Sequence, residues 1–267
     1  SSLTIDDSHP RINQLRIFNV KTILDYSVEG QENEQSFDQT LKETLRAIEF
    51  ANKHDAIPFC VLKLTGLGSK SLMTKIQLGK ELTGIEENQF SRFKARSFEV
   101  ADLVLKLNQR LLIDAEESWY QDVVDTLSYE LMIKCNTERV TVYNTYQFYR
   151  RDMLDKMKAG FEKMSASKVH FGAKIVRGAY MEQERFRAQS LGYPDPIQPN
   201  KEATDRDYNA GVKFAMENST HFSICLGTHN EASSKGLVEL MQQYGCEKND
   251  ERIFFAQLLG MSDNISF

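Results

Sequence analysis

The sequence predicts an α/β fold: a distorted (βα)8 barrel of the TIM type, formed by a single domain over residues 1–267. Two observations lead to this prediction. Short apolar runs alternate with longer amphipathic stretches along the 267 residues, which is the pattern of a parallel sheet whose strands are joined by helices. Polar residues gather at the C-terminal ends of these runs, and in a TIM barrel those ends form the active-site face.

Seven runs are predicted as buried strands because each is short and rich in β-branched, leucine or aromatic residues. A closed barrel of this type has eight strands. Either an irregular early segment serves as the eighth strand, or this sequence lacks its last strand and helix. We favour the second explanation. The predicted strands cover residues 19–28, 59–67, 110–116, 139–147, 171–180, 222–230 and 253–261.

Apolar residues between these runs recur at helical spacing. This spacing indicates helices that turn one face to the core. The clearest patterns cover residues 37–48, 93–107, 123–131, 153–164 and 237–244.

Composition excludes several classes of protein. Hydrophobic residues make up 41% and charged residues 27%, with a net charge of −5, so there is no basic footprint for nucleic acid. The four cysteines form no C-x-x-C pair, which argues against a metal site or a disulfide framework and favours a reducing compartment. No run approaches the roughly 18 apolar residues of a membrane span. The first ten residues lack the features of a signal peptide.

An open, doubly wound sheet is the alternative to a barrel. Neither G-x-G-x-x-G nor a P-loop follows the first run, and "TGLGSK" (65–70) matches both poorly. Polar residues also follow nearly all the runs, whereas an open sheet would concentrate them at one switch point. They are Asp25, Lys63, Thr65, Asp114, Glu116, Asn144, Gln147, Arg177, Tyr180, Thr228, His229, Asn230 and Gln257.

Lys63 and Asp114 are the first candidates for chemistry. Strand alternation places Lys63 on one face with Val61 and Thr65. A lysine among apolar residues there is either a Schiff-base lysine or a group that holds an anion. We expect Asp114, at the end of its own run, to pair with a cation of this face such as Lys63.

Cations dominate the rest of the predicted face. Lys174 and Arg177 lie in "FGAKIVRGAY" (171–180), and Lys201 opens a helical pattern where helix N–H groups could hold a phosphate. Arg177 is expected to pair with a carboxylate of the same face. Aromatic and apolar neighbours suggest a flat ring system. The residues alone therefore predict a barrel enzyme that binds a phosphate-bearing cofactor or substrate.

Six motifs together resemble one known family. In chain order they are "LLIDAEES", "NTYQFY", "KIVRGAYMEQER", "GYPDPIQPNKEATDRDY", "THNE" and "QLLGM", within a similarity that runs from about residue 18 to 267. The sequence is similar to proline dehydrogenase, in its monofunctional, eukaryotic-type form. The resemblance implies FAD-dependent oxidation of L-proline to Δ1-pyrroline-5-carboxylate, the first step of proline catabolism, by hydride transfer to flavin N5. It also implies that electrons pass to a membrane quinone through a peripheral membrane contact. The implied location is the mitochondrial matrix side of the inner membrane, or the bacterial cytoplasm.

The resemblance also implies roles by position. Lys63, Asp114, Lys174 and Tyr180 would be the catalytic residues, and no metal is implied. Lys174 would contact flavin N5, and Tyr180 would lie near the substrate together with Lys63 and Asp114. Either Leu258 or Leu259 would form an apolar wall over the proline ring. The remaining implied cofactor contacts are Asn144 at the flavin ring, Val176, Gly178 and Ala179 along it, Lys201 and Thr204 at the pyrophosphate and adenosine, and Thr228, His229 and Gln257 elsewhere on FAD.

One departure from the family keeps alternatives open. The family's last strand and helix carry a tyrosine and a tandem arginine pair that clamps the substrate carboxylate, and no such segment occurs in this sequence. The alternatives are a hydroxyproline dehydrogenase, a cofactor-free barrel lyase that uses Lys63 as a Schiff-base lysine, and an inactive truncated form that acts through interactions.

Overall fold

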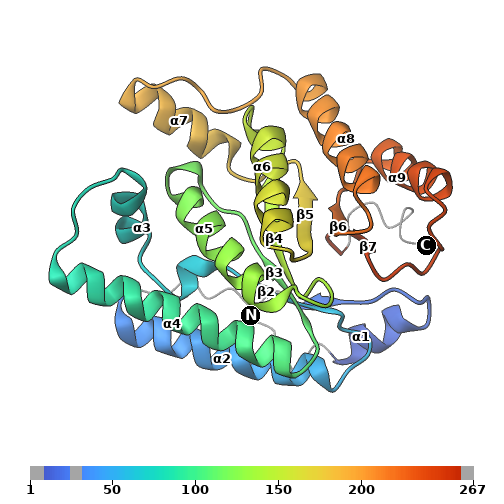
Figure 1. Cartoon of the computed structure of the whole chain (residues 1–267), viewed down its shortest axis with the longest axis horizontal. Helices are drawn as coiled ribbons and strands as arrows, with labels where there is room; N and C mark the ends of the chain where they lie inside the picture. Colours follow the sequence, from blue (N-terminus) through green and yellow to red (C-terminus); the bar gives the residue numbers. More distant parts are fainter. Residues whose placement is uncertain (1–8, 25–31, 260–267) are drawn as a thin grey trace.

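A computed structural model describes residues 9–24 and 32–259, which form an α/β fold (Figure 1). Its centre is a seven-stranded parallel sheet in which each strand pairs with the next strand of the sequence. Parallel neighbours need crossover connections, and helices provide most of them. The strands are β1 (Ile23–Leu24), β2 (Phe59–Leu62), β3 (Arg110–Ile113), β4 (Val142–Gln147), β5 (Phe171–Val176), β6 (Phe222–Gly227) and β7 (Ile253–Ala256).

The helices that pack directly on the sheet lie against one face, which we call the outer face, and others pack on those helices or stand apart (Figure 1). A short 3-10 turn, η2 (Leu64–Gly66), follows β2. None of the helices in the described part of the chain is long and apolar enough to cross a lipid bilayer. The helices are α1 (His9–Arg16), α2 (Glu34–Asn52), α3 (Lys70–Gln77), α4 (Gly84–Lys106), α5 (Ser118–Cys135), α6 (Met153–Ala166), α7 (Met181–Leu191), α8 (Lys201–Glu217) and α9 (Glu231–Gln243).

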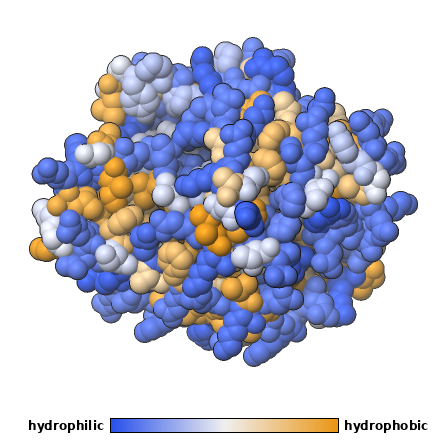
Figure 2. Space-filling model, viewed as in Figure 1, coloured by the Kyte–Doolittle hydropathy of each residue, from blue (hydrophilic) through white to orange (hydrophobic). Residues whose placement is uncertain are grey.

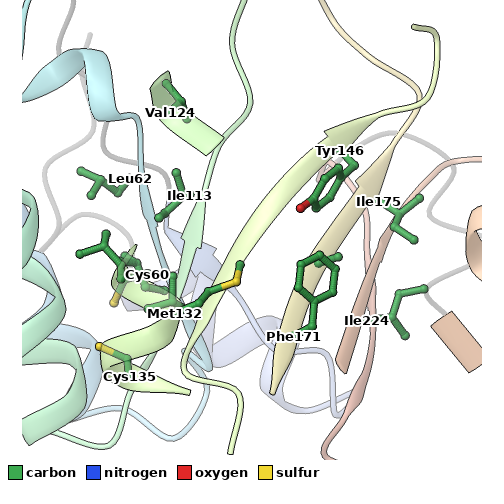
Figure 3. Packing of buried hydrophobic residues seen from close by; sticks show 14 of the residues in the cluster. Cys60, Leu62, Ile113, Val124, Met132, Cys135, Tyr146, Phe171, Ile175 and Ile224 are labelled. Carbon is green, nitrogen blue, oxygen red and sulfur yellow. The ribbon is translucent and has the colours of Figure 1, made fainter. Parts of the chain in front are cut away.

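Side-chain alternation divides the core between the two faces of the sheet. Outer-face residues such as Leu62, Ile113 and Ile175 pack against the helices in one large cluster (Figure 3). The opposite, inner face has its own cluster, which is built from strand residues and their close neighbours. The central strands β3 to β6 are therefore buried on both faces, as their apolar runs predicted, whereas Phe255 of β7 is exposed on the outer face.

Aromatic contacts across the inner face show that the sheet curls. Phe59 of β2 and Phe254 of β7 meet with ring centroids 4.7 Å apart, although four strands separate them in the sheet order. The Arg110 guanidinium of β3 also lies 5.1 Å from the Phe254 ring. A flat sheet could not bring these side chains together, because neighbouring strands are about 4.8 Å apart.

The predicted elements compare well with those observed, except at their ends. Each of the seven runs contains a strand, and each of the five helical patterns lies in a helix or runs slightly past its end. Several strands are shorter than predicted: β2 ends at Leu62, and β1 has two residues in the described part of 19–28. Asp25, predicted at the end of the first run, lies outside the described residues.

The α/β class and the curled parallel sheet are confirmed. The eight-unit barrel is not, because β1 pairs only with β2 and β7 only with β6 within residues 9–24 and 32–259.

Figure 2 shows one side of the molecule, where hydrophilic residues cover most of the surface and hydrophobic residues form small groups between them.

Candidate active site

Lys174 and Asp114 meet on the inner face, near the C-terminal ends of β5 and β3. Lys174 Nζ donates to Asp114 Oδ1, and the two side chains are only 18% and 17% exposed. The two strands are not neighbours: β4 lies between them, with Thr145 in register with Lys174. A largely buried cation is costly unless an anion meets it. Here the protein itself provides that anion.

Asp114 was expected to pair with a cation such as Lys63, and the structure gives it Lys174 instead. β2 ends at Leu62, and Lys63 begins the 3-10 turn with a half-buried side chain. Within the described ranges, the Lys63 ammonium group has no ion pair and no side-chain hydrogen bond. Lys63 can therefore attract an anion from outside the protein.

Arg177 pairs with α8, and not with Asp114 or Glu116 as the sequence suggested. Its Nε donates to Asp205 Oδ1 at 2.7 Å, its Nη1 to Thr228 Oγ1 at 2.8 Å and its Nη2 to Ser233 Oγ at 3.0 Å. The guanidinium carbon also lies 4.2 Å from the centroid of the Tyr208 ring. One side chain thus ties the end of β5 to the end of β6 and to the starts of α8 and α9.

The start of α8 gathers the predicted phosphate-binding residues. Asn200 caps the helix by accepting a 2.8 Å hydrogen bond from Ala203 N, and Thr204 is buried. Lys201 is 69% exposed and forms an ion pair with Asp205. Burial opposes ionisation of Asp205, but hydrogen bonds from Lys201 and Arg177 outweigh it and lower the pKa of that carboxyl. The spacing of four residues between Lys201 and Asp205 is a helical ion-pair signal that sequence reasoning missed.

A second hydrogen-bonded group joins the ends of β2 to β5. Glu116, which is 3% exposed, accepts hydrogen bonds from Thr65 N at 3.2 Å and Thr65 Oγ1 at 2.5 Å. Burial raises the pKa of Glu116, and the bonds from Thr65 oppose this. Gln147 Nε2 donates to the Glu116 carbonyl at 2.8 Å, and Gln147 Oε1 accepts from Ala179 N at 3.1 Å. Sequence reasoning placed Glu116 and Gln147 at strand ends and suggested only Arg177 as a partner for a carboxylate there, so it missed the bonds to Thr65, Gln147 and Ala179.

The turn after β5 brings backbone to the surface of the site. Gly178 has φ +135°, and an added Cβ would lie 2.0 Å from Tyr149 Cδ1. Gly178 and Ala179 are both exposed, and Tyr180 is half-buried. Only glycine suits this backbone position, both for its φ and for its contact with Tyr149.

Asn144 does not reach the inner face. Its side chain is fully buried (0% exposed), and its Nδ2 donates to Asp125 Oδ1 of α5 at 2.8 Å. Its neighbours at alternate positions, Val142 and Tyr146, belong to the core beneath the helices. The predicted flavin contact is therefore not supported, because Asn144 has no exposed surface to offer a ligand. Gln147, three positions further along β4, points to the inner face, where its amide is bonded to the Glu116 carbonyl and to Ala179 N.

The ends of β6 and β7 bring together predicted contact residues from both strands. Thr228 is buried, and its backbone N donates to Ala256 O at 3.1 Å. His229 Nε2 accepts from Leu258 N at 3.3 Å. His229 Nδ1 is buried and has no hydrogen-bond partner among the described residues. The side chains of Leu258 and Leu259 are 67% and 56% exposed, so both offer apolar surface beside this imidazole.

The sequence matches the family model described as proline dehydrogenase over residues 8–267. It is 37% identical over 185 residues to "Proline dehydrogenase 1, mitochondrial" of Homo sapiens. This alignment covers 68% of this chain and 31% of the relative. The protein of the same name from Dictyostelium discoideum is 29% identical over 307 residues, covering 99% of this chain and 54% of the relative. The chain spans only 28% to 31% of the human, Caenorhabditis elegans and Drosophila melanogaster relatives.

A solved structure has the same fold. It is the crystal structure of proline utilization A (PutA) from Bdellovibrio bacteriovorus inactivated by N-propargylglycine, with a TM-score of 0.85 at 19% identity. The superposition covers 97% of this chain and 28% of that one. Because the family model matches nearly the whole sequence, this chain belongs to the proline dehydrogenase family.

Proposed function

We propose that this chain oxidises L-proline to Δ1-pyrroline-5-carboxylate with FAD as its cofactor. One observation carries the proposal: Lys63, Asp114 and Lys174 lie together at the C-terminal ends of three strands, in a chain that belongs to this family. The active-site face of a curled parallel sheet lies at those ends. The reaction is stated as a proposal and not as a finding, because this sequence spans only 28% to 31% of the length of three of its relatives.

The donor groups at the ends of β5 to β7 fit FAD. A diphosphate needs cations and hydrogen-bond donors, and the start of α8 offers the Lys201 ammonium group, whereas Thr204 N and Oγ1 both donate to Asn200 O. The flavin ring needs a surface without bulky side chains, and the exposed Gly178–Ala179 turn provides one. His229 Nδ1, buried without a partner in the described part of the chain, still has a hydrogen bond to make.

FAD, when bound, supplies the acceptor for the hydride that leaves the ring carbon beside the proline nitrogen. We propose that the ring is lined by Lys174, Val176, Gly178 and Ala179, and that the rest of the cofactor is held by Lys201, Thr204, Thr228, His229 and Gln257.

The protein would bind and orient the substrate from the opposite side. Lys63 attracts the proline carboxylate because its ammonium group has no anionic partner among the described residues. Leu258 and Leu259 supply apolar surface for the ring, and Tyr180 borders it. Lys174 adds a fixed positive charge where negative charge develops, and Asp114 holds that lysine in place.

The finer predictions belong to the same proposal. β1 and β7 each keep one hydrogen-bonding edge without a partner in the described residues, so an eighth strand could complete an eight-unit barrel between them. A mitochondrial location is proposed because relatives are named mitochondrial, with the bacterial cytoplasm as the alternative. Quinone as the electron acceptor and a peripheral membrane contact are proposed from the family resemblance alone. The prediction of one domain over residues 1–267 stays a prediction.

A flavin spectrum tests the proposed function. The purified chain, incubated with FAD and desalted, should show flavin absorbance that L-proline bleaches under anaerobic conditions. Hydroxyproline should be tested in parallel, and the substrate with the higher kcat/KM decides between the two dehydrogenases. A protein that takes up no FAD would contradict the proposal. Bound FAD that neither amino acid bleaches would identify the inactive form.

Lys63 supports a second candidate function, because a lysine side chain without an anionic partner in the described residues can lose a proton, attack a carbonyl carbon as the neutral amine and form a Schiff base with loss of water. Borohydride treatment in the presence of a carbonyl compound such as pyruvate should then label Lys63 irreversibly. Peptide mapping would locate the label, and Lys63→Met is the matched control. An unlabelled Lys63 would count against the lyase.

A further inference from the structure

A chain of hydrogen bonds crosses the ends of four consecutive strands. It runs from Thr65, after β2, to Glu116, after β3, with donor–acceptor distances of 3.2 and 2.5 Å. It continues from the Glu116 carbonyl to Gln147 Nε2 at 2.8 Å, and from Gln147 Oε1 to Ala179 N at 3.1 Å. We call Thr65, Glu116, Gln147 and Ala179 the strand-end chain. Each link joins a residue from one loop or strand end to a residue from the next.

The two central side chains of the strand-end chain are closed to solvent. Glu116 and Gln147 are each 3% exposed, so water cannot readily replace a partner that is removed. Glu116 N is also bonded, to Gln121 Oε1 at 2.6 Å. A buried polar group left without its partner is costly, whereas a complete network holds one arrangement. The strand-end chain therefore resists changes in the spacing of the loops that it joins.

Three members of the strand-end chain stand within two residues of a proposed site residue. Thr65 follows Lys63 by two positions, and Glu116 follows Asp114 by two. Ala179 directly precedes Tyr180. Shifts in these loops would therefore move the proposed substrate contacts relative to one another.

We propose that Thr65, Glu116 and Gln147 are positioning residues: their hydrogen bonds set the distances among Lys63, Asp114 and Tyr180 across the substrate site. This inference rests on the proposed oxidation of proline. It deepens that proposal, because it assigns the geometry of the substrate side to three residues that need not touch either ligand. Misplacing a substrate contact by about 1 Å can cost on the order of 100-fold in rate.

Thr65 offers the mildest test. Thr65→Val keeps the shape of the side chain and removes the Oγ1 bond to Glu116, whereas Thr65→Ser keeps the hydroxyl. Ser97→Ala is the matched control, since buried Ser97 Oγ donates to Phe93 O at 2.9 Å within α4. It also loses one buried side-chain hydrogen bond, but on a helix that carries no proposed site residue.

Gln147 offers the stronger test. Gln147→Glu keeps an acceptor for Ala179 N but turns a carboxylate oxygen toward the Glu116 carbonyl, where the amide donated. Gln147→Met removes both bonds at similar volume. If either variant fails to fold, the Thr65 series still decides the question.

The measurements are kcat and KM for proline at saturating FAD, FAD affinity by fluorescence titration, and the unfolding midpoint. For Thr65→Val we expect kcat/KM for proline to fall about 10- to 100-fold, with FAD affinity within about twofold of wild type. Thr65→Ser should recover most of that loss, and Ser97→Ala should lower the unfolding midpoint without changing kcat/KM.

Two outcomes would overturn the inference, and they are distinguishable. If Thr65→Val and Gln147→Glu lose stability but keep wild-type kcat/KM, the strand-end chain has only a structural role. If the FAD-loaded wild-type chain does not oxidise proline, the proposed function fails first and the positioning role fails with it.

Discussion

Gly178→Ala is expected to be the most damaging single-methyl addition at any glycine of the candidate site. Gly178 has φ +135°, a backbone conformation that costs an alanine on the order of 1–3 kcal/mol. The new Cβ would also lie 2.0 Å from Tyr149 Cδ1 and 2.2 Å from Cε1. Tyr149 is only 5% exposed, so its ring cannot swing into solvent, and overpacking of this kind costs a further ~1–3 kcal/mol.

The two contributions together predict a loss of roughly 2–6 kcal/mol in the free energy of unfolding. Gly192→Ala separates them, since Gly192 has φ +71° but an added Cβ meets no atom within 4 Å. Its expected loss is about 1–2 kcal/mol from the left-handed backbone alone. Gly236→Ala is the opposite control. It lies inside α9 with open space and no positive φ, so it should gain about 0.5–1 kcal/mol.

Urea unfolding followed by far-UV circular dichroism measures all three variants. The reasoning predicts the order Gly236→Ala, wild type, Gly192→Ala, Gly178→Ala from most to least stable. A Gly178→Ala protein no less stable than Gly192→Ala would refute it, because the contact with Tyr149 would then have no cost.

Three further predictions follow from buried or capped groups. Burial raises the pKa of Asp125, so the folded state keeps a proton that the unfolded chain releases. The stability that this proton adds should be fully present below the pKa of Asp125 in the unfolded chain. It should be lost as pH rises through the pKa of Asp125 in the folded protein. Asp125→Asn should make this loss of stability smaller, and an unfolding midpoint that does not change with pH in the wild-type protein would contradict the prediction. Cys246 alone should react with Ellman's reagent in the native protein, because Cys60, Cys135 and Cys225 are buried and burial raises their pKa values to about 12, 11 and 12. Asn200→Ala removes the cap of α8, so it should cost about 1 kcal/mol of stability. It should also weaken FAD binding in a fluorescence titration. An unchanged FAD affinity would mean that the FAD phosphates do not bind at the start of α8.

The central strands could be predicted from the sequence because they are buried on both faces and therefore appear as nearly continuous apolar runs. Their ends could not be predicted as well. In 59–67 the apolar residues continue beyond Leu62, but the backbone turns into a 3-10 helix that keeps Leu64 and Leu67 buried. Burial alone does not distinguish a residue in an extended strand from a residue in a 3-10 turn. The curl of the sheet was likewise hidden, since it depends on contacts such as Phe59 with Phe254 that lie far apart in sequence.

The sequence could predict which residues lie at the candidate site, but not which of them contact each other or face inward. Asn144 shows why, because every residue of 140–147 is buried and the run has no alternation of polar and apolar positions. Without that alternation the sequence does not say which side chains face inward, and a shift of one residue exchanges the two faces. Pairing failed for a different reason. Lys174 and Asp114 are 60 positions apart, and only the register of β3, β4 and β5 brings them to the same level.

The ion pair between Lys174 and Asp114 changes how the charges of the site should be interpreted. Without any nearby anion, the ammonium groups of Lys174 and Lys63 would attract a carboxylate equally. Asp114 neutralises Lys174 at close range, whereas Lys63 has no anionic partner in residues 9–24 and 32–259. In the proposed function, the attraction of the substrate carboxylate is therefore assigned to Lys63 and not to Lys174. The ion pair with Asp114 holds the Lys174 side chain in position on the inner face and offsets part of the cost of burying it.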